Sequence, residues 1–477
     1  MSTAASDGRP RVTIVGGGLA GLATAVALAE SDCHVDLYEA RRSLGGRAGS
    51  FRDPSTGETV DHCQHVSMGC CTNLADFCRR VGITGLFRHD RRLHFIGPDG
   101  RQFPLAASLL PAPLHLAPSF WGFKFLSAGE RLDIGRAMWK LMRLRTSDTA
   151  GSPTVGEWLK QQQQSPRAVE LYWNVILVSA LGEELDRASL AAARKVIVDG
   201  FLASREAYVL EVPRVPLAAL YGETLERWLR ERGVQVHLNS PIRQVSHDDG
   251  PRVALADGNE LRPRFLVLAL PWHRLGDVVE SNLAARWPWL EAMSAVDSSP
   301  ITGVHLWFDR PIMPLEHAVL VGRLSQWVFH RSIDTVESDS SEVTKGGHYY
   351  QVVVSASRNL AGRDRGEIVD EVCRELASIW PQAAAARRLH ARVVTEQAAV
   401  FSVRPGLDQL RPVQQTATPG VLVAGDWTAT GWPATMEGAV RSGYLAAESI
   451  LHALDKPRKL LADDLPRGLL ARLLIRS

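Results

Sequence analysis

Three glycines near the start of the chain follow a predicted buried strand at a characteristic spacing. Gly16, Gly18 and Gly21 form a GxGxxG pattern that opens an apolar helical segment. Glycines at these positions permit a tight turn and let a pyrophosphate approach the backbone at a helix N-terminus. A second predicted strand, His34–Tyr38, ends at Glu39, 21 residues after Gly18. A carboxylate at that distance accepts hydrogen bonds from a ribose, so the unit is predicted to bind a dinucleotide.

A second glycine pair lies directly after this unit. Gly45 and Gly46 precede Arg47 and Ala48, and they add backbone N–H groups and one cation beside the expected phosphates. This loop resembles the GGR motif of FAD enzymes in the amine oxidase and carotenoid desaturase superfamily. The resemblance implies FAD, rather than a nicotinamide dinucleotide, as the cofactor.

The other end of the chain carries a matching segment, VAGDWTATGWPATMEGAVRSG, at residues 423–443. It resembles the carboxy-terminal flavin-binding motif of the same superfamily. The resemblance implies that Asp426 reaches the ribityl and phosphate region. Pro433 is expected to open a helix whose positive end faces the flavin pyrimidine, where reduction places negative charge.

The same resemblance implies an α/β fold in which a Rossmann-like FAD-binding domain is assembled from residues 1–100, 205–275 and 395–455. An inserted α+β substrate domain takes residues 101–204 and 276–394. The cofactor contacts that the resemblance implies come from Gly16, Gly18, Leu19, Ala20, Gly21, Glu39, Ala40, Arg41, Gly45, Gly46, Arg47, Ala48, Ile242, Gly425, Asp426, Met436, Glu437 and Ala439.

Length and composition indicate a folded protein of two domains with no nucleic-acid partner. The 477 residues are more than a single hydrophobic core usually holds, and 45% of them are hydrophobic. The formal net charge of +2 gives no reason to expect binding to nucleic acid. The start lacks a secretory signal pattern, so a cytoplasmic protein is expected. The six cysteines include no CxxC pair, which favours free thiols over a metal site.

Two apolar regions bear on membranes. Residues 102–123 are uncharged but hold four prolines, which would break a spanning helix. The tail, residues 456–477, combines six basic residues with leucine clusters. This pattern suits either an interfacial helix on the inner face of the cytoplasmic membrane or a terminal helix docked on the body.

The segment Val60–Val66 and the stretches at 110–120 and 425–444 together resemble the hydroxysqualene dehydroxylases. That resemblance implies a lipophilic isoprenoid substrate, noncovalent FAD and a separate electron-donating reductase. His65 is the candidate general acid because its ordinary pKa lets it carry a proton near neutrality. Asp61 is the second candidate catalytic residue and is expected to orient the loop. Cys63 departs from the pattern, since relatives commonly have glycine there.

Three alternatives stay open. A carotenoid-type desaturase would transfer hydride in the opposite direction, from substrate to FAD. An amine oxidase is disfavoured because Ser298–Arg310 lacks the lysine such enzymes generally place there, and no cysteine lies near residues 430–435. A non-enzymatic member of the fold would have to lose the flavin motifs that are present here.

Overall fold

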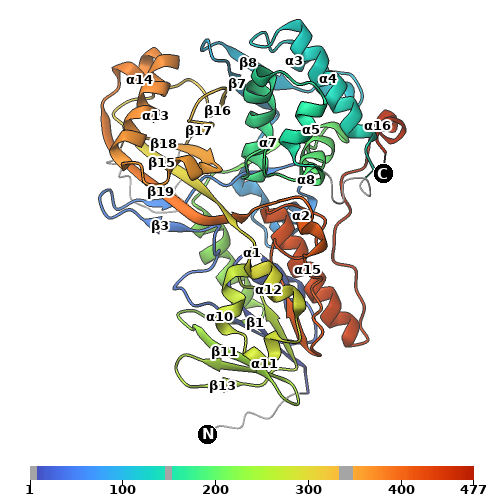
Figure 1. Ribbon diagram of the computed structural model, residues 1–477. Helices are drawn as coiled ribbons and strands as arrows, with labels where there is room; N and C mark the ends of the chain where they lie inside the picture. The colour runs from blue at the N-terminus through green and yellow to red at the C-terminus, as the bar shows by residue number, and fades with distance from the viewer. Residues whose placement is uncertain (1–7, 146–152, 332–346, 477) are drawn as a thin grey trace.

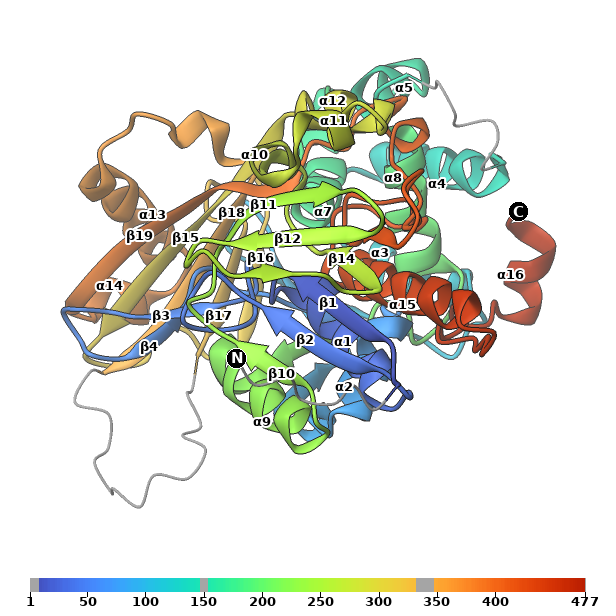
Figure 2. The ribbon, with the colours of Figure 1, turned by 90° about the horizontal axis from the view of Figure 1, so that it is seen from below.

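The computed structural model describes residues 8–145, 153–331 and 347–476. A five-stranded parallel sheet forms the centre of one domain, in the order β10-β2-β1-β14-β20 (Figure 2). Its strands come from three distant parts of the chain, and the three strands β1, β14 and β20 have nearly continuous buried apolar runs, as the centre of a sheet covered on both faces requires. The five strands are β1 Arg11–Val15, β2 His34–Tyr38, β10 Gln235–His237, β14 Phe265–Leu268 and β20 Val421–Val423.

Two helices pack against each other beside this sheet. The helix α1, Leu19–Ala29, has ten of its eleven residues buried and crosses α15, Met436–Ala453, at Gly443. A Cβ on Gly443 would lie 2.3 Å from the carbonyl oxygen of Ala20, so only glycine allows this approach. The first and last thirds of the chain are therefore joined in one core, as the three-piece domain requires.

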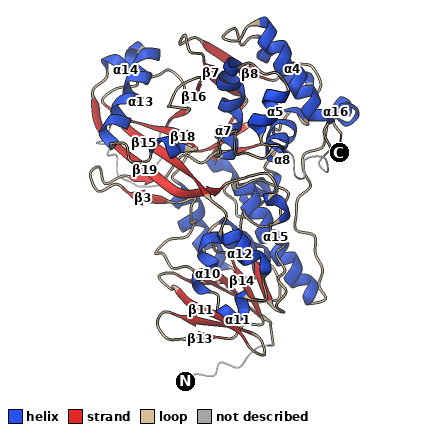
Figure 3. Cartoon of the chain, in the orientation of Figure 1, coloured by secondary structure: helices blue, strands red, loops and turns tan. Residues whose placement is uncertain are grey.

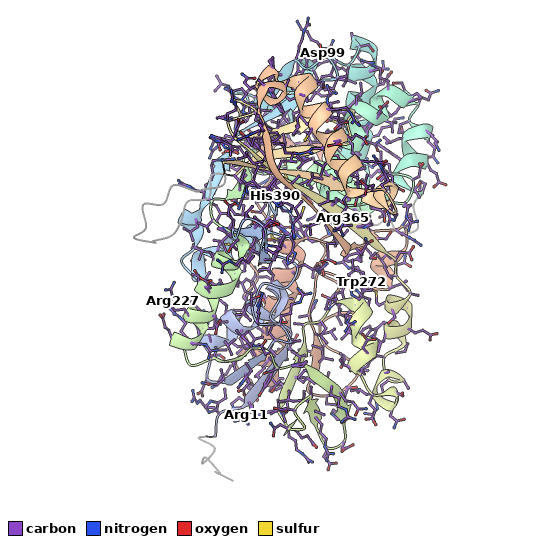
Figure 4. The ribbon with its side chains drawn as sticks, turned by 90° about the vertical axis from the view of Figure 1, so that its left-hand side faces the viewer. Arg11, Asp99, Arg227, Trp272, Arg365 and His390 are labelled. Carbon is purple, nitrogen blue, oxygen red and sulfur yellow. The ribbon has the colours of Figure 1, made fainter. Side chains whose placement is uncertain are left out.

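The second domain is built on a seven-stranded sheet, ordered β19-β15-β18-β17-β16-β7-β8, which lies above the first domain in Figure 1. Neighbouring strands in it are antiparallel except for β16 beside β7. In Figure 4, Arg11 lies near the lower end of the molecule and Asp99 near the upper end. The strands are β7 Arg92–Ile96, β8 Gln102–Ala106, β15 Ser298–Phe308, β16 His317–Leu320, β17 Trp327–His330, β18 His348–Ser355 and β19 Arg388–Phe401.

Two predicted domain boundaries are wrong. The strand β7 belongs to the seven-stranded sheet, so the first FAD-domain piece ends before residue 92 rather than at 100. The strand β19 continues through the predicted boundary at 395 to Phe401. Both errors arise because a strand's sequence does not reveal which sheet it joins.

Helices lie against the seven-stranded sheet, and further helices lie between this sheet and the carboxyl terminus (Figure 3). A smaller sheet, β11-β12-β13, extends the FAD domain, and β5, β6 and β9 form another. The remaining strands are β3 Ser50–Arg52, β4 Thr59–Asp61, β5 Ser67–Met68, β6 Phe87–Asp90, β9 Leu210–Pro213, β11 Ile242–His247, β12 Pro251–Leu255 and β13 Glu260–Leu261. The larger remaining helices are α2 Thr72–Arg80, α3 Ala117–Trp121, α4 Ala128–Arg143, α5 Val155–Gln161, α7 Asn174–Leu181, α8 Leu190–Arg194, α9 Thr224–Glu231, α12 Pro288–Ser294, α13 Arg365–Ile379, α14 Pro381–Ala385 and α16 Leu469–Leu474.

The tail runs as a strap from the FAD domain to the second domain. The N–H of Ala462 donates to Asn73 Oδ1, and the N–H of Gly468 donates to the carbonyl of Ala203. In the short helix α16, Ala471 is buried against the body. Among the described residues, no helix has the length and apolar character needed to cross a bilayer.

Candidate flavin and substrate site

A cavity of about 880 Å³ lies between the two domains. It is bounded at one end by both glycine loops and at the other by strands of the seven-stranded sheet. Of the 18 residues expected to contact the cofactor, 17 line it, and Gly21 does not. A Cβ on Gly21 would lie 1.9 Å from the carbonyl oxygen of Gly16. Gly21 therefore allows the helix to pack against the loop that precedes it.

The two glycine loops stack backbone to backbone. The N–H of Gly45 donates to the carbonyl of Gly17 at 2.8 Å, and a Cβ on Gly46 would lie 3.0 Å from the Cα of Gly18. A Cβ on Gly18 itself would have no protein atom nearer than 3.9 Å, because that side of the loop faces the cavity. The N-terminus of α1 has no side-chain cap and no acidic residue in its first turn. Its N–H groups can thus receive a phosphate.

Glu39 fixes the loop and lines the cavity. Its Oε2 accepts from the N–H of Gly17 at 2.7 Å, and its Oε1 accepts from the N–H of Arg41 at 2.8 Å. Each carboxylate oxygen keeps a second lone pair, which fits the expected hydrogen bonds from a ribose.

Arg47 and Asp426 meet across 379 residues of sequence. The guanidinium of Arg47 donates to Oδ1 of Asp426 at 2.6 Å and to the carbonyl of Ala399 at 2.7 Å. Asp426 is almost fully buried, whereas about a third of the Arg47 side chain is exposed. The pair places a cation and an acceptor together on the cavity wall, as a phosphate and a ribityl chain would require.

The helix expected to begin at Pro433 begins instead at Met436. Thr435 caps it by accepting the N–H of Gly438 at 3.1 Å, and Pro433 lies in the preceding loop. Glu437 is fully buried, and its carboxylate accepts from the backbone N–H groups of Asn73 and Leu74. It therefore caps α2, and burial raises its pKa. Its side chain joins two elements, so any cofactor contact would come from its backbone.

His65 lines the cavity, and its hydrogen bond shows which ring nitrogen carries a proton. Its Nδ1 lies 2.9 Å from the carbonyl of Cys63, which can only accept, so Nδ1 carries a proton. Burial lowers the pKa of His65. Burial therefore favours the neutral form, with an acceptor at Nε2, over the protonated form that an ordinary histidine pKa would allow.

Asp61 does not line the cavity. Its carboxylate accepts from Ser50 Oγ at 2.7 Å, from the N–H of Leu217 at 2.8 Å and from Arg331 at 3.1 Å. These contacts hold β4 and the loop that follows it. These contacts fit a residue that orients the loop, and Asp61 does not reach the cavity where a catalytic group would meet the substrate.

Gln64, which the sequence analysis passed over, is a buried side chain on the cavity wall. Its Nε2 donates to the carbonyl of His65 at 3.0 Å, and that contact fixes the orientation of the amide. Its Oε1 is buried without a hydrogen-bond partner among the described residues. An unpaired buried acceptor costs about 1–3 kcal/mol, so a ligand that donates to Oε1 gains affinity if the Gln64 side chain turns toward the cavity to meet it.

Three thiols also reach the cavity. Cys63, Cys70 and Cys71 line it, and Cys70 packs against Trp432 in the carboxy-terminal flavin segment. No cysteine lies near residues 430–435 in the sequence, so only the fold brings Cys70 to that segment. Burial raises the pKa of Cys63 to about 12, and hydrogen bonding to Cys70 together with burial raises the pKa of Cys71. Because the thiolate is the nucleophile, protonated thiols are consistent with noncovalent FAD.

Most of the remaining cavity wall is apolar, although Ser179, Lys195 and Ser355 also line it. The apolar side chains come from β7, α7, β9, β16, β17, β18 and the π-helical segment Lys195–Leu202. The residues are Leu93, Phe95, Val175, Ile176, Phe201, Leu210, Val319, Trp327, Phe329 and Val353. A hydrocarbon chain fits this wall, because each contact would remove apolar surface from water.

Known proteins resemble this chain over most of its length. A 15-cis-phytoene desaturase of Solanum lycopersicum is 26% identical over 470 residues, covering 92% of this chain and 77% of that protein. A hydroxysqualene dehydroxylase of Zymomonas mobilis is 26% identical over 448 residues, covering 92% and 98%. The solved cyclohexylamine oxidase of Brevibacterium oxydans shares the fold, with a TM-score of 0.67 at 18% identity over 94% of this chain and all of that one.

The family model for flavin containing amine oxidoreductases matches residues 19–451. The match runs from the start of the helix α1 through the second glycine loop and the substrate domain into the helix α15. The chain therefore belongs to the flavin containing amine oxidoreductase family and is an FAD-dependent oxidoreductase.

Proposed function

We propose that this enzyme removes the hydroxyl group of hydroxysqualene to give squalene. The observation that carries the proposal is a pair of neighbouring acceptors on cavity-lining residues, Nε2 of His65 and Oε1 of Gln64, of which Oε1 is buried behind the wall. A substrate hydroxyl can donate to Nε2 of His65 directly, and to Oε1 of Gln64 once that side chain turns toward the cavity. A carotenoid hydrocarbon offers no such donor and would leave the buried amide oxygen of Gln64 unpaired.

FAD supplies a hydride when it is bound in its reduced form. The overall change replaces a C–O bond with a C–H bond and, with one proton, releases water. The chain's part is to position the hydroxyl and to exclude bulk water from the carbon that loses it. The apolar wall serves the second need, since water would capture an allylic cation.

His65 is the residue we assign to deliver the proton. Its protonated form can donate through Nε2 while Nδ1 stays bonded to the carbonyl of Cys63. Because burial lowers its pKa, the protonated form is scarce near neutrality but is a stronger acid. Turnover should therefore increase as the pH falls below the ordinary histidine range.

The test uses the full chain with its FAD reduced anaerobically. Added hydroxysqualene should give one squalene for each flavin reoxidised. Gln64→Leu should lower kcat/KM about tenfold, in line with one lost hydrogen bond, with unchanged FAD content. Gln235→Leu, at an exposed glutamine of β10, is the matched control. Normal kcat/KM in Gln64→Leu would remove the acceptor from the proposal.

A carotenoid desaturase is the second candidate, supported by the similarity to a phytoene desaturase over 92% of the chain. A desaturase would transfer hydride from substrate to oxidised FAD. Bleaching of the oxidised flavin by a polyene precursor, with no response of the reduced enzyme to hydroxysqualene, would establish this direction.

The dehydroxylase proposal also requires a source of electrons. The sequence holds one GxGxxG unit, and the geometry of its loop suits FAD. We therefore propose that a separate reductase, rather than a second dinucleotide on this chain, returns the flavin to its reduced form.

A further inference from the structure

A second cavity, of about 670 Å³, lies among the helices of the substrate domain. Its walls come from α3, α4, α7 and the π-helical segment Lys195–Leu202. The lining is largely apolar and includes Leu116, Phe120, Phe123, Met138, Ile197 and Leu202. No residue of the flavin-binding loops borders it.

The two cavities share a wall. Ile176 and Phe201 line both of them, so the apolar space beside the flavin site and the second cavity are separated by the side chains of these residues. A passage between the two spaces requires these side chains to move.

The mouth of the second cavity lies on an exposed apolar surface. Leu114, Trp121, Leu132 and Trp139 border this cavity and are each between 44% and 49% exposed. Leu109 and Leu110, which come shortly before Leu114 in the chain, are also exposed. On α16, Leu469 and Leu473 are 81% and 76% exposed. Eight of the eleven exposed large apolar side chains in the described residues lie on these segments.

The helix α16 lies beside the same surface. The N–H of Arg476 donates to the carbonyl of Met142 at the end of α4, and Gly468 packs against Ala112. Figure 1 shows α16 close to α4 and α5, at the right-hand edge of the upper domain. The docked strap thus carries its two exposed leucines on a helix that contacts the end of α4 and Ala112.

Positive charge surrounds these apolar side chains. Residues 117–145 hold six basic and two acidic residues, and residues 467–476 hold three basic and none acidic. These two segments therefore carry +7, while the whole chain carries +2. The guanidinium of Arg131 lies 5.4 Å from the ring centroid of Trp121, and that of Arg143 lies 5.9 Å from that of Trp139. A tryptophan beside a cation suits the headgroup level of a membrane.

We propose that this surface, which we call the docking face, binds an anionic bilayer, and that the second cavity admits the apolar substrate from the bilayer to the flavin site. The docking face consists of residues 109–145 and α16. A second copy of the chain is a poorer occupant, because a two-fold contact would bring two surfaces of like charge together. The passage of substrate rests on the proposed function, whereas the docking does not.

The first experiment measures co-sedimentation of the FAD-loaded full chain with phosphatidylglycerol vesicles and with phosphatidylcholine vesicles. Binding to the anionic vesicles should be stronger and should weaken with salt. The double variant Leu469→Glu/Leu473→Glu should lower that binding at least tenfold. Leu389→Glu, which changes a leucine that is 44% exposed on β19, should leave it unchanged. Equal loss in both variants, or no binding by the unaltered protein, would overturn the proposal.

The same samples are examined by sedimentation velocity. A dimer that dissociates in Leu469→Glu/Leu473→Glu, with no vesicle binding by either protein, would assign the docking face to self-association. A monomer that binds vesicles supports the bilayer.

The second experiment tests the passage. Gly135 borders the second cavity, and a Cβ there would meet no atom within 4 Å, so larger side chains fit without displacing the fold. Gly135→Trp should keep vesicle binding and FAD content while lowering turnover of vesicle-borne hydroxysqualene at least tenfold. Gly135→Ala is the matched control. Unaltered turnover in Gly135→Trp would refute the passage, while absence of turnover in the unaltered enzyme would refute the proposed function and leave the docking result standing.

Discussion

Replacing Gly18 by alanine separates cofactor binding from folding. Gly18 precedes α1 with φ −76° and ψ 176°, a conformation that alanine adopts without strain. An added Cβ would lie 3.9 Å from the nearest protein atom, the Cα of Gly46. The methyl group would therefore disturb no protein contact, but it would project toward the space where the backbone is expected to meet the pyrophosphate.

The structure sets the size of both effects. The free energy of unfolding of the apoprotein should change by less than about 1 kcal/mol, and loss of glycine's freedom in the unfolded chain favours a small gain. In the complex, a methyl group at this position prevents phosphate oxygens from approaching the loop N–H groups. Loss of two charge-assisted hydrogen bonds at about 1.5 kcal/mol each weakens FAD binding by about 3 kcal/mol, or roughly 150-fold.

The assay titrates apoprotein with FAD by flavin fluorescence and follows thermal unfolding of the same apoprotein. Gly21→Ala is the contrasting variant, because its Cβ would lie 1.9 Å from the carbonyl oxygen of Gly16 and should destabilise the apoprotein itself. Gly135→Ala, on an open helical surface, controls for the substitution alone. Wild-type FAD affinity in Gly18→Ala would refute the assignment of this loop to the pyrophosphate.

Four further outcomes are expected. Asp426→Ala should lower the flavin absorbance per protein, because the acceptor opposite the cofactor's ribityl chain is lost; unchanged flavin content would contradict its assignment. Asp61→Asn should lower the free energy of unfolding by about 3–5 kcal/mol, since it leaves the buried guanidinium of Arg331 without its carboxylate, while FAD-loaded molecules keep their turnover. His65→Ala should slow dehydroxylation roughly 10²-fold and abolish the increase in turnover at low pH, and an unaltered pH profile would remove it as the acid. The raised pKa of Glu437 means that the folded state binds more protons than the unfolded state above pH 4.5. The stability advantage of wild type over Glu437→Gln, measured by urea titration, should therefore decrease as the pH rises through that range.

The local sequence determined the flavin-binding motifs. The GxGxxG loop, the second glycine pair and the Asp426 segment each depend on backbone conformation or on contacts within a few residues. Their residue types therefore identify them without knowledge of the fold. The local pattern likewise predicted the strand before Gly16 and the strand His34–Tyr38, which are β1 and β2 of the parallel sheet.

Tertiary structure decided what each side chain does. His65 was expected to carry a proton, but burial in a cavity formed by two domains lowers its pKa. Glu437 lies within a flavin motif, yet its carboxylate caps a helix 363 residues earlier in the chain. Desolvation and hydrogen-bond partners depend on residues distant in sequence, so no local pattern contains them.

The tail shows the same division. Its composition indicated an amphipathic segment and left two alternatives, a helix docked on the body or a helix at a membrane. In the structure Ala471 is buried, while Leu469 and Leu473 remain exposed on a helix that lies beside α4. A sequence fixes which residues are apolar, whereas only the packing of the strap against α4 and the Ala112 segment decides which of them face the protein and which face outward.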